Sequence, residues 1–172
     1  MITRKTILTA AFLCAFGATV FCDEVLYDGK DVGAKVSAKA AKDPKDAKNE
    51  VGEIVRANVG GALKIIPANQ DWSKFKAISF KLHAEGASGA QLAITLGSNP
   101  VESKGGNYYL HIMKIDWDGW KTVEIPFSKF QKVRKPVGYN QITDMVINTR
   151  GWNIKPTKTA KLMIDDIKLI SK

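Results

Sequence analysis

Strict alternation of apolar and polar residues is the feature of this chain that most limits its fold. In residues 77–83 the apolar side chains fall at Ile78, Phe80 and Leu82, with polar residues between them, and residues 92–96 repeat the pattern. Successive side chains of a β-strand point to opposite faces, so this pattern predicts strands with one buried face. Similar runs recur about every ten residues with almost no helical periodicity, which predicts an antiparallel β-sandwich of about nine strands.

Glycine, proline, asparagine and aspartate bound the expected strands. These strands lie at 24–27, 53–58, 62–66, 77–83, 92–96, 108–115, 120–126, 144–149 and 161–170, and residues 34–38 are a further candidate. Residues 53–58 and 62–66 flank Gly60-Gly61 and are expected to form a hairpin. Residues 40–49, which contain Pro44, and the basic stretch 129–139 are expected to be loops.

The last expected strand contains a break in its alternation. Leu162 and Ile164 share one parity, whereas Ile167 and Leu169 share the other. A β-bulge near Asp165-Asp166 would return all four side chains to one buried face.

The first 22 residues have the pattern of a secretory signal peptide. Arg4 and Lys5 precede an apolar run from Ile7 to Phe21, and Asp23 opens the polar chain. Cleavage after Cys22 or after Gly17 fits the small-residue rule, and the first is preferred. The sequence therefore predicts a signal peptide at 1–22, one domain at 23–172, and a secreted or periplasmic location. Lipidation at Cys22 is disfavoured because Thr-Val-Phe precedes it.

Cleavage behind Cys22 would remove both cysteines, Cys14 and Cys22. The remaining domain would then have no disulfide, zinc-thiolate site or cysteine nucleophile. Without Arg4 and Lys5 the chain has 24 basic and 17 acidic residues, a net charge of +7. This charge favours polyanionic partners such as an acidic polysaccharide. The lysines form no dense block, which argues against nucleic acid, and the apolar run is too short for a transmembrane segment.

Most of the domain resembles a known fold family. The resemblance rests on residues 72–82, 108–127, 142–147 and 162–169, and above all on Gly119-Trp120-Lys121, Ile125-Pro126-Phe127-Ser128 and Ile164-Asp165-Asp166-Ile167. These segments are similar to the galactose-binding-like jelly roll of carbohydrate-binding modules. The resemblance implies sugar binding, no chemistry of its own, and sometimes a structural calcium ion. It places such a calcium at Asp28 with Asp165 or Asp166, although Tyr27-Asp28 departs from the Phe-Glu type of pair that is common in the family.

A ligand site is expected on the strand at 108–115. If Leu110 and Ile112 fill the interior, Tyr109, His111 and Met113 lie on the outer face, where they could stack on a sugar and donate hydrogen bonds. The alternative is that this strand is covered on both faces.

Three further residues are candidates for ligand binding. Trp152 lies in a loop beside Arg150, so an exposed indole could stack on a sugar while the guanidinium binds a carboxylate or sulfate. Trp117 is the third candidate, from a turn between two aspartates. Trp72 and Trp120 are expected to pack in the interior.

Three functions remain open from the sequence. The first is a non-catalytic carbohydrate-binding protein, for which an acidic polysaccharide is one ligand. The second is a protein-interaction or assembly module on the same scaffold, with no affinity for sugar. A separate enzyme or protein is a further expected partner of the domain. The third is a small polysaccharide lyase that uses Tyr109 and His111. Nucleophile-elbow, zinc-protease and phosphate-loop motifs are absent from the sequence, which favours a protein without catalytic residues.

Overall fold

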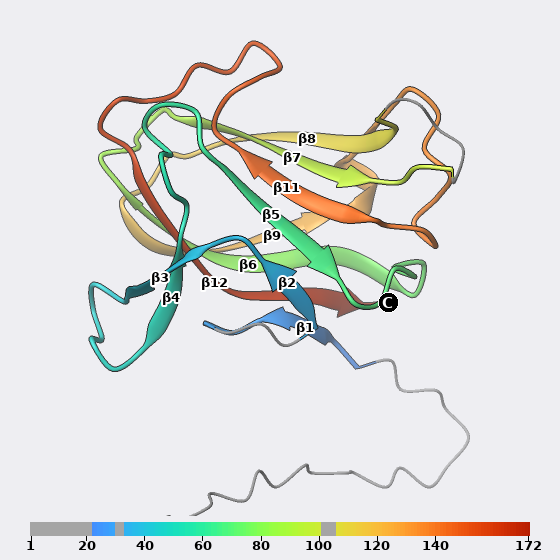
Figure 1. Ribbon diagram of the computed structural model, residues 1–172, viewed down its shortest axis with the longest axis horizontal. Helices are drawn as coiled ribbons and strands as arrows, with labels where there is room; N and C mark the ends of the chain where they lie inside the picture. Colours follow the sequence, from blue (N-terminus) through green and yellow to red (C-terminus); the bar gives the residue numbers. More distant parts are fainter. Residues whose placement is uncertain (1–21, 30–32, 101–105) are drawn as a thin grey trace, which may run out of the picture.

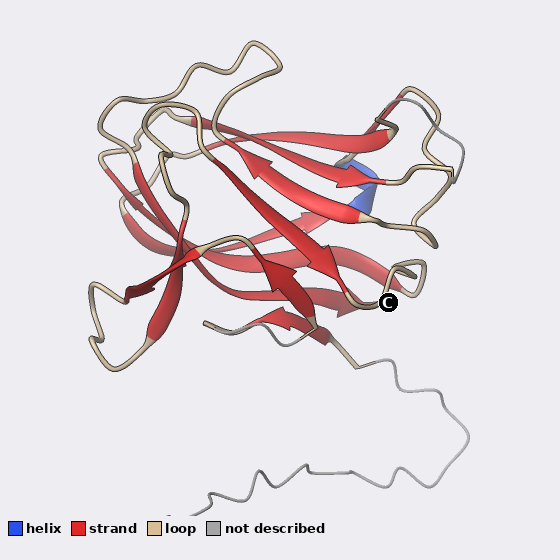
Figure 2. Ribbon diagram, in the orientation of Figure 1, coloured by secondary structure: helices blue, strands red, loops and turns tan. Residues whose placement is uncertain are grey.

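The computed structural model describes residues 22–29, 33–100 and 106–172. They form two antiparallel six-stranded sheets that face each other, and a single turn of 3-10 helix, η1 (Phe127–Lys129), is the only helical element in these ranges (Figures 1 and 2). The β6 sheet contains β3 (Lys39–Lys42), β4 (Glu50–Glu53), β12 (Lys161–Ser171), β6 (Phe75–Glu85) and β9 (Gly119–Pro126) in that order, with β1 (Glu24–Tyr27) also paired to β12. The β7 sheet runs β10 (Gln131–Val133), β8 (Tyr108–Lys114), β7 (Gln91–Gly97), β11 (Asp144–Asn148), β5 (Ala62–Pro67) and β2 (Ala34–Val36).

The alternating runs build the core, as predicted. Ile78, Phe80 and Leu82 of β6 are fully buried, and so are the apolar residues of β7 at 92, 94 and 96. The inner faces of the two sheets meet through these side chains. The predicted antiparallel β-sandwich is therefore confirmed.

The predicted bulge in the last strand is also confirmed. Asp165 pairs with Lys81, whereas the next pair is Lys168 with Ser79, so three steps along β12 oppose two along β6. Asp166 adopts a φ of 54° at this point. The extra residue restores the buried face, since Ile167 is fully buried like Ile164 before the bulge.

Three expectations about the strands are wrong. Residues 39–42 and 50–53 form the β3–β4 hairpin, so only 43–49 of the expected loop 40–49 is a loop, and the basic stretch 129–139 contains β10. The described residues hold twelve strands. Both β3 and β10 are short edge strands with lysines, and because their residues are mostly exposed they show no clear alternation. Residues 53–58 do not form a hairpin with β5, because β5 pairs with β11 and β2.

Within the part of the chain that the structure describes, no helix reaches the length and hydropathy that a membrane crossing requires. The predicted signal peptide at 1–22 lies outside the described residues, apart from Cys22, which is exposed.

Candidate functional site

The orientation of β8 is the reverse of the one predicted. Tyr109 is 3% exposed and its ring stacks on Tyr139, with centroids 4.3 Å apart and an angle of 15°. Met113 packs against the core, whereas Ile112 is 41% exposed on the other face. The expectation that Tyr109, His111 and Met113 face outward is therefore wrong.

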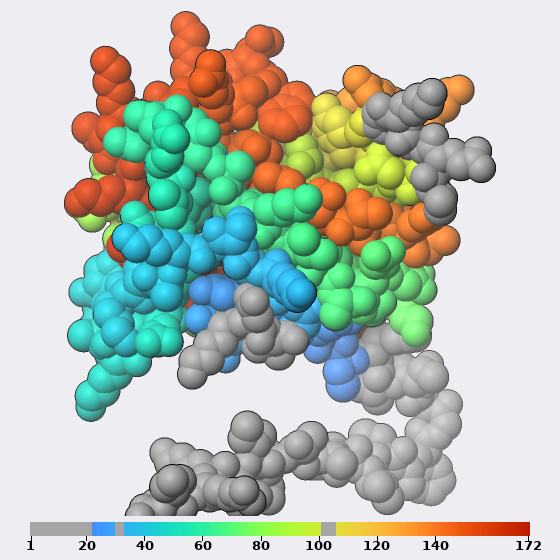
Figure 3. All heavy atoms as spheres, in the orientation of Figure 1, coloured from blue at the N-terminus to red at the C-terminus, as the bar shows by residue number. Residues whose placement is uncertain are grey.

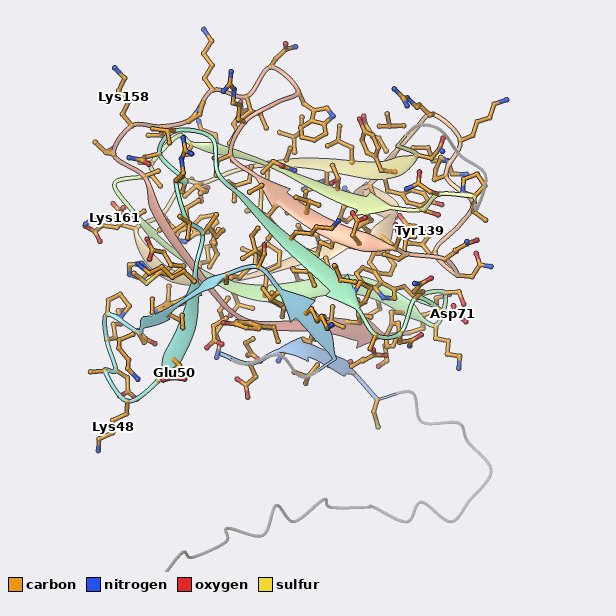
Figure 4. All side chains as sticks on the ribbon, in the orientation of Figure 1. Lys48, Glu50, Asp71, Tyr139, Lys158 and Lys161 are labelled. Atoms are coloured by element: carbon orange, nitrogen blue, oxygen red, sulfur yellow. The ribbon has the colours of Figure 1, made fainter. Side chains whose placement is uncertain are left out.

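An aromatic stack explains this reversal. Tyr139 lies between Tyr109 and Phe127, and its hydroxyl donates a hydrogen bond to the Phe127 carbonyl at 2.9 Å. Burial raises the pKa of both tyrosines, and for Tyr139 the neighbouring Tyr109 adds to the effect of burial. Figure 4 shows Tyr139 at the same end of the sandwich as Asp71. The inner face of β8 thus supplies aromatic packing at this end of the core.

His111 belongs to the same inner face. Its ring lies 5.5 Å from the ring of Phe130, and its Nδ1 is 3.3 Å from the carbonyl oxygen of Lys129. The side chain is half-buried beside the 3-10 turn. His111 therefore contacts the protein interior instead of the outer surface of the sheet.

The outer face of the β7 sheet carries a cleft of about 330 Å³. Its wall and floor come from three neighbouring strands, β8, β7 and β11, and from the loops that follow β7 and β11. The lining residues are Thr95, Gly97, Asn99, Gly106, Asn107, Tyr108, Asp144, Val146, Asn148 and Trp152. This volume is at the small end of the range for ligand sites, about 300–1,000 Å³.

The strand register explains why the face is hollow here. Gly97 of β7 pairs with Tyr108 on one side and with Asp144 on the other. The next outward residue of β7, Thr95, is also smaller than its neighbours Leu110 and Val146. A central strand with small side chains, between two strands with larger ones, makes a groove.

Trp152 is the one predicted ligand-binding residue that lines this cleft. It lies in a tight turn closed by the Gly151–Ile154 bridge, with φ of 49° at Trp152 and 65° at Asn153. Left-handed backbone is uncommon for a bulky residue and often marks a functional position. The loop that contains this turn stands at the upper edge of the molecule, above the β7 sheet (Figures 1 and 3).

The turn directs the indole across the groove. The Nε1–H of Trp152 donates a hydrogen bond to the Tyr108 hydroxyl at 3.0 Å, and the two ring planes meet at 78°. Trp152 remains 37% exposed. Two aromatic surfaces at a large angle are therefore open to a ligand.

Polar groups complete the cleft. The Thr143 hydroxyl lies 3.3 Å from the Asp144 carboxylate, and the Lys64 ammonium lies 4.0 Å from it. At the other end, Asn107 donates to the Asn99 side chain from both its backbone and its amide nitrogen. The cleft thus combines aromatic faces with oxygen and nitrogen groups suited to hydroxyls.

Arg150 and Trp117 do not line this cleft. The aliphatic part of Arg150 packs over Gly60, where an added Cβ would lie 2.9 Å from the arginine Cδ. Trp117 donates to the Leu82 carbonyl at 3.4 Å and lies under the Lys121 ammonium, 4.5 Å from its ring centroid. Arg150 therefore does not join Trp152 in lining this cleft.

Of the two tryptophans assigned to packing, only Trp72 is in the core, where it is fully buried. Trp120 is half-buried on the outer face of β9, where its Nε1–H donates to Asp43 at 2.9 Å and its edge meets His83. Its predicted interior position is wrong, because β9 places Val123 and Ile125 on the inner face instead.

The three aspartates assigned to calcium are in different environments. Asp166 forms ion pairs with Lys81 at 3.2 Å and Lys168 at 3.4 Å, and Asp28 is exposed in a turn. Asp165 is 6% exposed, and its Oδ1 has no hydrogen-bond partner. The described residues contain no group of three or more His, Cys, Asp or Glu that could hold a metal ion. The full predicted trio is thus not brought together.

Comparison with known proteins decides the family. Residues 20–172 match the sequence profile of the family 11 carbohydrate-binding domain. The chain belongs to carbohydrate-binding family 11. The predicted resemblance to carbohydrate-binding modules with a jelly-roll fold is therefore confirmed.

Similar proteins agree with the family 11 assignment. Endoglucanase H of Acetivibrio thermocellus is 28% identical over 151 residues, which cover 84% of this chain and 16% of that enzyme. The chain thus spans about a sixth of this relative. A solved family 11 module from Clostridium thermocellum, in complex with a β-1,3-1,4-mixed-linked tetrasaccharide, superposes with a TM-score of 0.65 at 22% identity, covering 87% of this chain and 95% of the module. A family 30 module of a cellulosomal cellulase from the same organism gives 0.62 at 12% identity, covering 88% and 99%.

For this family 11 domain, sequence reasoning missed Tyr108, Asp144 and Asn148. Tyr108 shares its parity with Leu110 and Ile112, so an interior position for these two aliphatic residues would also place Tyr108 inside. The stacking of Tyr109 on Tyr139, thirty positions away, fixes the opposite face as the inner one.

Proposed function

We propose that this family 11 domain binds a neutral β-linked glucan in the cleft over β7. The observation that carries the proposal is the pair of accessible aromatic rings, Tyr108 and Trp152, beside the polar groups of Asp144 and Asn148. Sugar rings have apolar faces and polar edges, and aromatic rings with a few placed polar groups match both.

The angle between the two rings favours a chain that turns. An all-β-1,4 glucan is a flat ribbon, whereas each β-1,3 linkage changes its direction. The rings of Tyr108 and Trp152 meet at 78°, so neighbouring sugars of a turning chain could each lie against one of them. A β-1,3-1,4 glucan, the ligand named for the solved family 11 module, is therefore the ligand that we propose for this chain.

The charge in the cleft favours a neutral ligand over an acidic one. Among the described lining residues Asp144 is the only charged side chain, and a carboxylate repels uronates and sulfates. The acidic-polysaccharide hypothesis depends on Arg150, which lies over Gly60, and on the net charge of the chain. Binding of an acidic polysaccharide stays a prediction, and a panel of neutral and acidic ligands separates it from the binding of a neutral glucan.

We infer that the domain has no catalytic activity of its own. Glycoside hydrolysis needs two carboxylic groups across the bond, and Asp144 is the single one in the described cleft. The lyase alternative assigned roles to Tyr109 and His111, which contact the interior instead. The domain would then act by holding a glycan for an enzyme, as a segment of a longer protein or as a separate partner.

Export and calcium belong to the same proposal. The basic and apolar start of the chain supports export to the medium or the periplasm, where polymeric glucan is found. For calcium we propose Asp165 as the anchoring ligand, because its buried Oδ1 has no hydrogen-bond partner. Its Oδ2 accepts a hydrogen bond from the Asn49 amide nitrogen, which also donates to Asp43. Calcium takes carboxylate oxygens of this kind.

Isothermal titration calorimetry tests the function. The ligands are a β-1,3-1,4 tetrasaccharide, an all-β-1,4 tetrasaccharide and polygalacturonate. We expect binding to the first, weaker binding to the second and none to the third. The proposal is overturned if none of the β-glucans binds at about 1 mM, which corresponds to roughly −4 kcal/mol.

A further inference from the structure

Gly97 lies at the end of the central strand β7, at the floor of the cleft. It is buried, and its φ is outside the left-handed region that favours glycine. An alanine could adopt this backbone, and a glycine in a strand weakens the strand because it has no side chain to pack. Backbone conformation therefore does not explain the glycine, and the space above it does.

A side chain at this position would meet the polar wall of the cleft. An added Cβ would lie 2.9 Å from both the Asp144 Oδ1 and the Thr143 hydroxyl, and 3.0 Å from the Asp144 Oδ2. Real Cβ atoms essentially never lie so near to other heavy atoms. An alanine at this position would therefore require the Asp144 carboxylate and the Thr143 hydroxyl to move from their present positions, where the carboxylate lies 3.3 Å from that hydroxyl and 4.0 Å from the Lys64 ammonium.

The missing side chain leaves a notch between two functional groups. Tyr108 and Asp144 both pair with Gly97, from opposite sides. Neighbouring strands lie about 4.8 Å apart, so the Cα atoms of these two residues are about 10 Å apart across the glycine. The Oδ1 of Asp144 forms no hydrogen bond within the described residues, so it can accept one from a ligand at the notch.

We infer that Gly97 is a specificity-determining residue of the cleft. This rests on the proposed function: one sugar ring lies against Tyr108, and an unsubstituted hydroxyl of that ring enters the notch and donates to Asp144. A substituent on this hydroxyl has no room above Gly97. A carboxylate there would also be repelled by Asp144, so the site selects unmodified neutral glucan over carboxymethylated glucan.

The test compares four proteins against two polymers. The proteins are the wild type, Gly97→Ala, Asp144→Asn, and the control Ala40→Ser, which adds one heavy atom to an exposed strand of the other sheet. Affinity electrophoresis measures their binding to β-1,3-1,4 glucan and to its carboxymethylated form, and thermal melting checks that each variant is folded.

We expect Gly97→Ala to weaken binding to the unmodified glucan at least about tenfold, whereas Ala40→Ser binds like the wild type. Asp144→Asn, which keeps the size of the side chain, is expected to reduce the preference in binding for the unmodified over the carboxymethylated glucan. The inference is overturned if folded Gly97→Ala binds like the wild type, or if Asp144→Asn leaves the preference unchanged. If Gly97→Ala does not fold, the comparison of Asp144→Asn with the wild type decides whether the inference holds. A wild type that binds neither polymer would overturn the proposed function itself.

Discussion

The indole N–H of Trp152 donates a hydrogen bond to the hydroxyl of Tyr108 at 3.0 Å, across the strand that lies between them. Tyr108 is on β8, Trp152 follows β11, and β7 separates the two strands. The bond thus connects the two walls of the groove. Because Trp152 remains exposed, a ligand hydroxyl can replace either partner of this bond.

Replacing Trp152 by alanine should reduce glucan binding with little effect on stability. The ring is accessible and its single hydrogen bond is to an outer-face tyrosine, so we expect an unfolding free energy within about 0.5–1 kcal/mol of the wild type. An aromatic residue central to a site contributes about 2 kcal/mol or more, so affinity should fall roughly thirtyfold. Calorimetry and thermal melting measure the two effects.

Trp117→Ala is the matched control for this prediction. Trp117 is half-buried, but it packs against the core and hydrogen-bonds to Leu82 outside the cleft. We expect its loss to lower the melting temperature and to leave affinity unchanged. Equal losses of affinity in both variants would assign the effect of Trp152→Ala to general disturbance.

The sequence was sufficient for the sandwich because alternation is a local signal. Ile78, Phe80 and Leu82 can only share a face if residues 77–83 are extended. The bulge at Asp165-Asp166 was equally accessible, since the parity change between Ile164 and Ile167 has few other solutions. The edge strands β3 and β10 were missed because their lysines and alanines carry no such pattern.

The site was harder to predict, because its location depends on contacts distant in sequence. Alternation shows that Tyr108 and Tyr109 face opposite ways, but it does not show which is inside. Here the aromatic stack on Tyr139 buries Tyr109 and leaves Tyr108 in the groove. Trp152 could be found because a tryptophan in a glycine-containing loop is unusual without a ligand or a packing role.

The pH dependence of stability should reflect the buried tyrosines. In the unfolded chain tyrosine ionises near pH 10, whereas burial, with Tyr109 close by, raises the pKa of Tyr139 in the folded state. The raised pKa stabilises the folded state fully below the unfolded pKa, and this contribution is lost as pH rises above about 10. Urea unfolding from pH 8 to 12 should therefore show stability falling at the alkaline end.

Tyr139→Phe supplies the control for the alkaline loss. It keeps the ring stack with Tyr109 and Phe127 but removes the ionisable hydroxyl and its hydrogen bond. We expect lower stability at pH 8 and a shallower decline above pH 10 than in the wild type. An identical slope in both proteins would mean that other groups cause the alkaline loss.

Calcium should stabilise the wild type through Asp165. A buried carboxylate oxygen without a partner is costly, and a cation that binds it only in the folded state raises stability. At a calcium concentration about 100 times the Kd the gain would be about 2.7 kcal/mol. Asp165→Asn should melt at the same temperature with calcium and with chelator. A wild-type melting temperature that calcium does not change would contradict the proposal.

Trp120→Ala should lower the free energy of unfolding less than the truncation of an interior tryptophan would. Truncating a large aromatic side chain in a core costs about 3–5 kcal/mol, but Trp120 lies on the outer face, where it covers His83 and binds Asp43. We expect a loss of about 1–2 kcal/mol, mainly from the lost hydrogen bond to a charged group.

Burial raises the pKa of Asp43, but hydrogen bonds from the backbone of Lys45 and from Trp120 outweigh this and keep the pKa below its usual value. The variant should therefore lose part of the stability that the wild type has above the usual aspartate pKa, and the difference between the two should shrink as pH falls through the folded pKa. Urea unfolding at pH 7 and pH 3 measures this, and a loss of 3 kcal/mol or more would place Trp120 in the core after all.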